Sequence, residues 1–233
     1  MEKYDTLPDA ITMNKEDHQL LREGARKFGV TLSEEQVYLF ALFLEGLWSW
    51  NRQTNITGIS EKREMIIKLL VDPLVAAPYL SSSGTVLDIG SGAGIPGLPI
   101  KIARPEFEVH LIESKAKKVS FLKDIIRRLG LKGIEAYWGR AQQRTDLPTL
   151  FPFYDIVTAR ALAPLEKTCS ICSPYLAAGG LLVTFKGSRV DQEIKDSERV
   201  MEELHLTISK KILYSLPETD GNRCLLIMKK GGD

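Results

Sequence analysis

The stretch "TVLDIGSGAGIPGLPI", residues 85–100, decides the fold class of this chain. An apolar run ends at Asp88, four glycines follow within eight positions, and apolar spacing then resumes. Glycine adopts left-handed backbone conformations that other residues avoid, so the stretch predicts a strand, a tight turn and the start of a helix. A turn of this kind holds a nucleotide-like ligand in many α/β proteins.

The chain after residue 84 repeats the strand–helix unit. Apolar runs predict strands over 85–89, 107–113, 133–139, 154–161 and 179–187, with a closing strand pair over 206–216 and 223–230. Helical spacing predicts helices over 95–105, 114–131 (with Ser114 as its N-cap), 164–177 and 189–203. This alternation predicts an α/β fold with a mostly parallel, seven-stranded sheet and helices on both faces.

Residues 1–80 read instead as a helical extension. Ser33 is a candidate N-cap for a helix that carries large apolar residues at helical spacing, and two shorter helices are expected to meet near Asp72–Pro73. The polar run "SSSG" at 81–84 is a plausible joint. We therefore expect an N-terminal helical extension over 1–80 and a ligand-binding domain over 81–233.

Composition excludes several classes of protein. The net charge is +1, so any nucleic-acid surface must be local. No targeting segment is visible, and the apolar segment 37–50 is too short to span a membrane. Three cysteines without an export signal favour reduced thiols in the cytoplasm, and three widely separated histidines argue against a metal site. We expect a monomer with no metal and no membrane contact.

Two glycine registers compete within the opening stretch. Gly92, Gly94 and Gly97 spell the dinucleotide fingerprint G-x-G-x-x-G, whereas Gly90, Gly92 and Gly94 spell a turn that directly follows the strand. The second register leaves Pro96 free for the first turn of the helix. We favour the second register.

Charge points to the ligand of this turn. A carboxylate at Asp88 would repel a pyrophosphate, but it suits S-adenosylmethionine, whose ammonium and sulfonium groups are positive. Glu113 ends the next strand, 23 residues after Gly90, where an acid can bind both ribose hydroxyls. The residues therefore favour S-adenosylmethionine, and a nicotinamide-linked oxidoreductase remains an alternative.

Several further motifs resemble one family within the class I, Rossmann-like methyltransferases. They are "WNRQTNITGI" at 50–59, "VDPLVAAPYL" at 71–80, "DIGSGAGIPGLPIKIARPE" at 88–106, "SKAKKVSFLKDI" at 114–125, "GRAQQ" at 139–143, "VTARALAPL" at 157–165 and "FKG" at 185–187. Together they span nearly the whole chain and resemble the RsmG (glucose-inhibited division protein B) family. Members of that family methylate N7 of a guanine in the 530 loop of 16S ribosomal RNA. The resemblance implies that 16S ribosomal RNA, or the small ribosomal subunit, is the partner.

The resemblance also implies roles for individual residues. Gly90 and Ile95 would line the methionine and ribose side of the cofactor, Ala141 and Gln142 would flank its adenine, and Arg160 would lie between the cofactor and the target base. The sequence departs from the family at two places: no histidine precedes Asp72, and Gln142 stands where an acid is common. A contact to adenine through the backbone N–H of residue 142 would survive that change.

The strand that ends at Arg160 carries no element for engaging an exocyclic amine and no Pro-Cys nucleophile. This absence suits guanine N7, whose free lone pair requires no base, and makes positioning the main catalytic task. The candidate RNA contacts form a basic rim and a patch on the helical extension, namely Asn51, Asn55, Arg140, Lys186 and Arg189. Two further readings stay open: methylation of a small molecule or protein, and a non-catalytic RNA-binding factor.

Overall fold

A seven-stranded sheet forms the centre of the protein, in the order β3-β2-β1-β4-β5-β7-β6. The computed structural model describes residues 12–142, 150–219 and 221–232. The strands are β1 (Gly84–Ile89), β2 (Phe107–Glu113), β3 (Ile134–Trp138), β4 (Tyr154–Arg160), β5 (Leu176–Lys186), β6 (Leu206–Tyr214) and β7 (Arg223–Lys230). β1 to β5 run parallel and β7 pairs antiparallel with β5 and β6, which confirms the predicted mostly parallel sheet.

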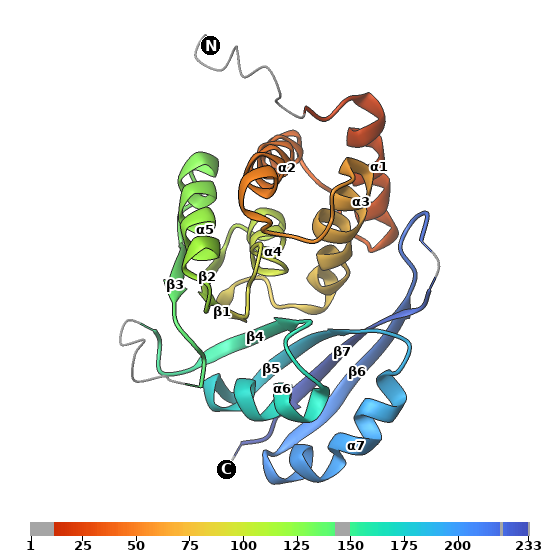
Figure 1. Ribbon diagram of the computed structural model, residues 1–233. Coiled ribbons are helices and arrows are strands. Elements are labelled where there is room, and N and C mark those ends of the chain that lie inside the picture. The colour runs from red at the N-terminus through yellow and green to blue at the C-terminus, as the bar shows by residue number, and fades with distance from the viewer. Residues whose placement is uncertain (1–11, 143–149, 220, 233) are drawn as a thin grey trace.

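Helices cover both faces of this sheet (Figure 1). One face carries α1 (Lys15–Lys27), α2 (Glu34–Thr54), α4 (Gly97–Ala103), α5 (Ala116–Leu129) and a continuous helical segment made of α3 (Lys62–Met65), the π-helix η1 (Ile66–Val71) and the 3₁₀ helix η2 (Asp72–Tyr79). The other face carries α6 (Leu165–Cys172), the short η4 (Ser173–Tyr175) and α7 (Val190–Glu203). Successive strand residues point to opposite faces, so Val86 joins the first hydrophobic cluster and Leu87 the second.

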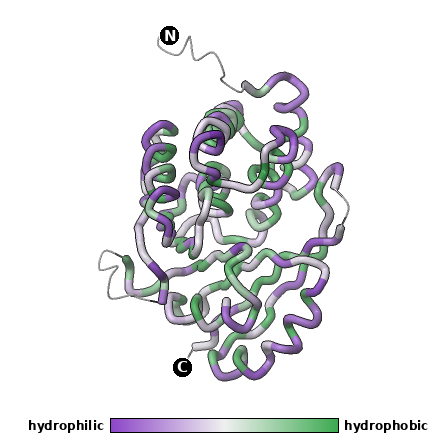
Figure 2. Tube along the Cα trace, in the orientation of Figure 1, coloured by the Kyte–Doolittle hydropathy of each residue, from purple (hydrophilic) through white to green (hydrophobic). Residues whose placement is uncertain are grey.

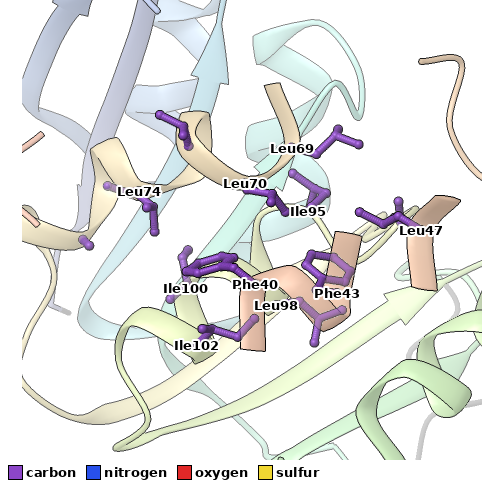
Figure 3. Packing of buried hydrophobic residues seen from close by; sticks show 14 of the residues in the cluster. Phe40, Phe43, Leu47, Leu69, Leu70, Leu74, Ile95, Leu98, Ile100 and Ile102 are labelled. Atoms are coloured by element: carbon purple, nitrogen blue, oxygen red, sulfur yellow. The ribbon is translucent and has the colours of Figure 1, made fainter. Parts of the chain in front are cut away.

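The N-terminal helices belong to the larger of these two clusters. Phe40, Phe43 and Leu47 of α2 point toward Leu70 of η1 and Leu98 of α4 (Figure 3). Along the chain, hydrophobic residues follow the inner strands and hydrophilic residues the outer turns of α2 and α7 (Figure 2). Residues 15–79 therefore pack as one layer of the same hydrophobic core that the sheet and α4 contribute to. The expected domain boundary at residue 80 stays a prediction, drawn from the order of the elements along the chain.

Ser33 caps α2 as predicted, because its side chain accepts from the Gln36 N–H and Gln36 reaches back to the Ser33 N–H. Ser114, however, is not the cap of α5. That helix begins after its N-cap residue Lys115, whose own N–H donates to Glu113 Oε1 at 2.7 Å, and within the described residues no side chain accepts from the first-turn N–H groups as a cap.

Two further boundaries differ from those expected. The helix predicted over 164–177 ends at Cys172, and β5 already begins at Leu176. Gly180 lies so close to the Tyr154 carbonyl that a Cβ would approach it to 3.1 Å, and the β4–β5 register shifts there. At Asp72–Pro73 the chain stays helical and changes from a π-helix to a 3₁₀ helix. Pro73 is tolerated because it lies in the first turn of the 3₁₀ helix, where the N–H that proline lacks would have no partner within that helix.

Candidate functional site: a cleft at the carboxyl end of the sheet

The glycine turn follows β1 at the point where the strand order reverses, between β1 and β4. Gly90, Gly92 and Gly94 all have positive φ angles, of 73°, 57° and 81°. Gly97 already lies in α4, and a Cβ there would come within 2.4 Å of Leu111. The geometry therefore confirms that the turn uses the register of 90, 92 and 94, directly after the strand.

The three turn glycines are required for different reasons. A Cβ at Gly90 would meet Leu162 at 2.8 Å, and one at Gly94 would meet Leu98 at 2.4 Å. At Gly92 the nearest atoms, Lys118 Nζ and the Gly90 carbonyl, lie 3.7 and 3.8 Å away. Packing thus explains Gly90 and Gly94, whereas Gly92 faces open space beside the cleft.

Glu113 lies at the floor of this cleft. Its Oε2 accepts from the Gly92 N–H at 2.9 Å, and its Oε1 accepts from the Lys115 N–H and, at 3.2 Å, the Ser114 hydroxyl. The residue is 7% exposed and lines the cleft. A carboxylate has about four lone-pair sites, so Glu113, with three of them in use, retains one for a hydroxyl of a ligand.

Asp88 does not line the cleft. Its carboxyl group is fully buried, where Oδ1 accepts from the Thr158 hydroxyl at 2.8 Å and Oδ2 from the Gly97 N–H at 3.2 Å. Burial raises the pKa of Asp88 to about 6, against the lowering effect of these hydrogen bonds. Asp88 therefore holds α4 against β4 from beneath the turn, and the expected direct contact with a ligand cation does not fit this geometry.

The cleft has a volume of about 530 Å³ and a polar, cationic mouth. The residues that line it are Asn55, Ile56, Thr57, Gly58, Leu69, Gly90, Ser91, Gly92, Ala93, Ile95, Glu113, Lys115, Lys117, Lys118, Arg160 and Ala161. The turn, the end of β2, the end of β4 and the loop after α2 thus meet here. Gly90, Gly92, Ile95, Glu113 and Arg160 come together as expected.

Arg160 reaches the cleft from the end of β4 and is anchored on its other side. Its Nη1 donates to the Lys68 carbonyl at 2.9 Å, and its Nη2 lies 3.0 Å from the carboxylate of Asp72. The side chain is 17% exposed, and burial lowers its pKa, with Arg223 adding to that effect and Asp72 opposing it. Arg160 therefore presents a fixed, partly desolvated cation to the cleft.

Asp72 is the residue that sequence reasoning missed. It is fully buried and ion-paired with both Arg160 and Arg223, and it accepts from the Tyr214 hydroxyl at 2.7 Å. Burial beside this carboxylate also raises the pKa of Tyr214. A single acid inside the apolar run "KLLVDPL" is the available signal, because such an acid is rarely buried without cations.

The predicted RNA-contact residues are scattered. Asn55, Arg140 and Arg189 are exposed, and only Asn55 among them lines the cleft. Asn51 uses its side chain internally, donating to the Ile59 carbonyl and accepting from the Thr57 N–H. Lys186 is 8% exposed and ion-paired with Glu193, which is no position for a phosphate contact on a rim.

The two residues expected to flank an adenine, Ala141 and Gln142, follow β3. Ala141 is buried and its carbonyl accepts from the Tyr175 hydroxyl, while Gln142 is exposed. Neither is among the residues that line the cleft, and residues 143–149 lie outside the described residues. Their contact with an adenine stays a prediction.

A metal cluster, a membrane-spanning helix and a reactive thiol were also sought in the described parts of the chain. Within residues 12–142, 150–219 and 221–232, no group of three or more His, Cys, Asp or Glu residues could hold a metal ion. No helix there is long and apolar enough to cross a bilayer. All three cysteines are free and buried, and burial raises the pKa of Cys169 to about 11, which disfavours a reactive thiolate.

Comparison with known proteins gives a consistent result. Residues 36–220 match the family model described as rRNA small subunit methyltransferase G. "Ribosomal RNA small subunit methyltransferase G" of Lachnoclostridium phytofermentans is 35% identical over 92% of this chain and 89% of its own length. The protein of the same name from Acetivibrio thermocellus is 36% identical over 91% and 88%.

Solved structures are similar in fold. A methyltransferase from Pyrococcus furiosus aligns with a TM-score of 0.55 at 15% identity, over 83% of this chain and 98% of its own. Fibrillarin from Aeropyrum pernix, in complex with S-adenosyl-L-methionine, aligns with a TM-score of 0.53 at 17% identity, over 66% and 73%. These similarities confirm the Rossmann-like methyltransferase fold.

Proposed function

Since the chain belongs to the rRNA small subunit methyltransferase G family, we propose that it transfers a methyl group from S-adenosylmethionine to N7 of a guanine in the 530 loop of 16S ribosomal RNA. The observation that carries the proposal is the joining of Gly92, Glu113 and Arg160 in one cleft. Gly92 and Glu113 suit the binding of a nucleoside cofactor, and the Arg160 guanidinium suits an electron-rich edge of a base. The substrate is naked RNA or a small ribosomal subunit.

The cleft fits the cofactor. When bound, S-adenosylmethionine supplies an electrophilic methyl group on a sulfonium. The open turn at Gly92 leaves room for the ligand, and Glu113 provides a carboxylate at the strand end, where ribose hydroxyls are bound in related folds. Ile95, 7% exposed, supplies an apolar wall. We place the adenine toward Ala141 and Gln142.

Arg160 is the candidate catalytic residue. Guanine N7 has a free lone pair, so the protein's task is to hold the base in line with the methyl group, and no residue must remove a proton. Arg160 can donate to a base oxygen or a phosphate while Asp72 and the Lys68 carbonyl fix its direction. A donor fixed in this way loses little entropy when the substrate binds.

Lysines at the mouth of the cleft are the strongest candidates for phosphate contacts. Lys115 and Lys117 are exposed and Lys118 is half-buried, and all three line the cleft beside the turn. Lys117 also donates to the Thr54 carbonyl at 2.9 Å, which joins α5 to the C-terminal end of α2. Phosphate contacts here would add affinity without choosing the base. Asn55, Arg140 and Arg189 remain candidates at the periphery.

We also propose that the protein works as a monomer, in the cytoplasm and without a metal. Ribosomal RNA is a cytoplasmic substrate, and the three free, buried thiols suit a reducing compartment. Sedimentation analysis with and without small ribosomal subunits would test the state of assembly.

Labelled methyl transfer tests the function. The protein is incubated with labelled S-adenosylmethionine and small subunits that lack the modification, and the nucleosides are then separated. We expect label in N7-methylguanosine, near-complete loss of label in Arg160→Ala, and full activity in Arg199→Ala, whose side chain is 89% exposed on α7. Label in another nucleoside, in protein or in no product would overturn the proposed reaction.

A further inference from the structure

We propose that a second cavity, next to the cofactor cleft, receives the target base, and that Glu193 and Lys186 recognise it as guanine; this rests on the proposed function. The cavity has a volume of about 250 Å³. That is roughly eight water molecules at ~30 Å³ each, the scale of a nucleobase and not of a nucleoside cofactor. Enzymes that modify a base inside folded RNA or DNA take it out of its stack into a pocket of this kind.

The cavity adjoins the methyl-transfer site. Ala161 lines both hollows, and Leu162, which lines the second, packs against the first glycine of the cofactor turn. Ala161 has a φ of 51°, uncommon for a residue with a side chain, so the chain turns sharply there between the two spaces. A base in the second cavity therefore lies beside a cofactor in the first.

The lining supplies apolar faces for a ring and polar groups for its edge. Ala159 and Leu162 are apolar, while Thr184, Lys186 and Glu193 are polar. Thr184 and Lys186 lie two residues apart on β5 and therefore face the same side of the sheet. Apolar walls with a few convergent polar groups are typical of a ligand site.

Thr184 is the independent sign of a ligand. Its hydroxyl is buried, with the residue 1% exposed, and it has no hydrogen-bond partner among the described residues. A buried polar group without a partner is unfavourable, because it has lost its hydrogen bonds to water. A hydroxyl at the wall of a cavity recovers this cost when a polar ligand enters.

Glu193 has a free acceptor at the same place. Its Oε2 accepts from Lys186 Nζ at 2.7 Å and from the Leu165 N–H at 3.0 Å. Within the described part of the chain, no hydrogen bond falls on Oε1, and the side chain is 29% exposed. Lys186 Nζ also donates to the Ala163 carbonyl at 3.2 Å and, with three donors, retains one for a ligand.

Glu193 and Lys186 together complement the Watson–Crick edge of guanine and not that of adenine. Guanine presents two adjacent donors, N1–H and the N2 amino group, next to the O6 acceptor. A carboxylate accepts from the donors, and an ammonium donates to O6. Adenine presents an acceptor at N1 and an amino group at C6, so Glu193 and Lys186 would each face a like group. Reading the Watson–Crick edge also leaves N7, on the adjacent Hoogsteen edge, free of contacts with Glu193 and Lys186.

The test compares guanine with inosine, which lacks only the N2 amino group. Small subunits are assembled with 16S RNA that carries either base at the target position, and kcat/KM is measured for both. We expect the unmodified protein to prefer guanine by about tenfold to a hundredfold, the range for one bidentate contact. In Glu193→Gln, whose amide retains an oxygen for Lys186 and the Leu165 N–H, we expect the rate with guanine to fall and this preference to vanish.

The control variant is Glu198→Gln, an exposed acid on the same helix, in which we expect the preference to remain. Thermal unfolding of each variant separates misfolding from altered recognition. Equal rates with guanine and inosine in the unmodified protein, or an unchanged preference in Glu193→Gln, would overturn the base-reading assignment. If the unmodified protein places no methyl group on RNA at all, the proposed function itself fails, and the two failures are thereby distinguished.

Discussion

Replacing Asp72 by asparagine should destabilise the protein far more than a comparable surface change. Asp72 is fully buried and is the carboxylate shared by Arg160 and Arg223, each with a nitrogen 3.0 Å away. Asparagine keeps the shape and the acceptor oxygen but removes the charge. The two guanidinium groups, only 17% and 29% exposed, would then lie close together without a counter-charge.

The expected magnitude follows from the burial of this cluster. Removing one member of a buried ion pair costs about 3–5 kcal/mol, because the partner stays charged in a poorly solvated place. Arginine offers no escape by losing its proton at neutral pH. For a chain of this size 1 kcal/mol corresponds to about 2–4 °C, so we expect the melting temperature to fall by roughly 6–20 °C.

Circular dichroism or calorimetry of Asp72→Asn beside Asp124→Asn provides the measurement. Asp124, 19% exposed, also contacts two arginines, but these are 75% and 43% exposed, and asparagine keeps an oxygen that can accept from the Trp50 indole N–H. Exposed pairs are worth about 0–1 kcal/mol, so the control should melt within about 4 °C of the unmodified protein. If both variants lose the same few degrees, the buried cluster does not carry the stability assigned to it.

Three further outcomes are expected. Gly92→Asp should abolish cofactor binding in calorimetry, while Gly92→Ala should weaken it less, because only aspartate adds a charge beside Glu113. If the two variants lose the same affinity, the loss comes from backbone strain at a φ of 57° and not from charge. Asp88 has its pKa raised from 3.8 to about 6, so the folded state holds that proton more tightly than the unfolded state. The free energy of unfolding, relative to that of Asp88→Asn, should therefore fall by on the order of 3 kcal/mol as the pH rises from below 4 to above 6. If the free energies of unfolding of the two proteins change in parallel with pH, Asp88 does not titrate in this way. RNA binding should weaken steeply with salt and less steeply in Lys117→Ala/Lys118→Ala, and a flat response would remove phosphates from the interface.

The sheet was predictable because its local signals agree with its global arrangement. Strands buried on both faces read as near-continuous apolar runs, and the helices between them keep a 3.6-residue period. The position of Gly90 directly after β1 also sufficed to choose the register of the turn. Boundaries were less predictable where tertiary contacts decide them, as at Leu176, which was expected in a helix but begins β5, where it pairs with Tyr154 of β4.

The candidate site was predictable only for residues whose neighbours in the chain reveal them. Glu113 and Arg160 end strands, so the topology alone brings them to one edge of the sheet. The partners of Asp72 at Tyr214 and Arg223 lie 142 and 151 residues away, and no periodicity reports such a contact. The same limit hid the burial of Asp88, whose place at a strand end looks equally suited to a solvated acid.

Asp72 also changes the meaning of the N-terminal segment. Sequence patterning presents residues 1–80 as an extension, yet Asp72 and the Lys68 carbonyl hold Arg160, and Asn55 and Leu69 line the cofactor cleft. A segment that fixes the direction of the candidate catalytic arginine cannot move without moving the site. Because Arg223 of β7 shares the same carboxylate, this buried charge also joins the N-terminal helical segment to the last strand of the sheet. Stability and the proposed positioning of the substrate by Arg160 therefore depend on the same contact.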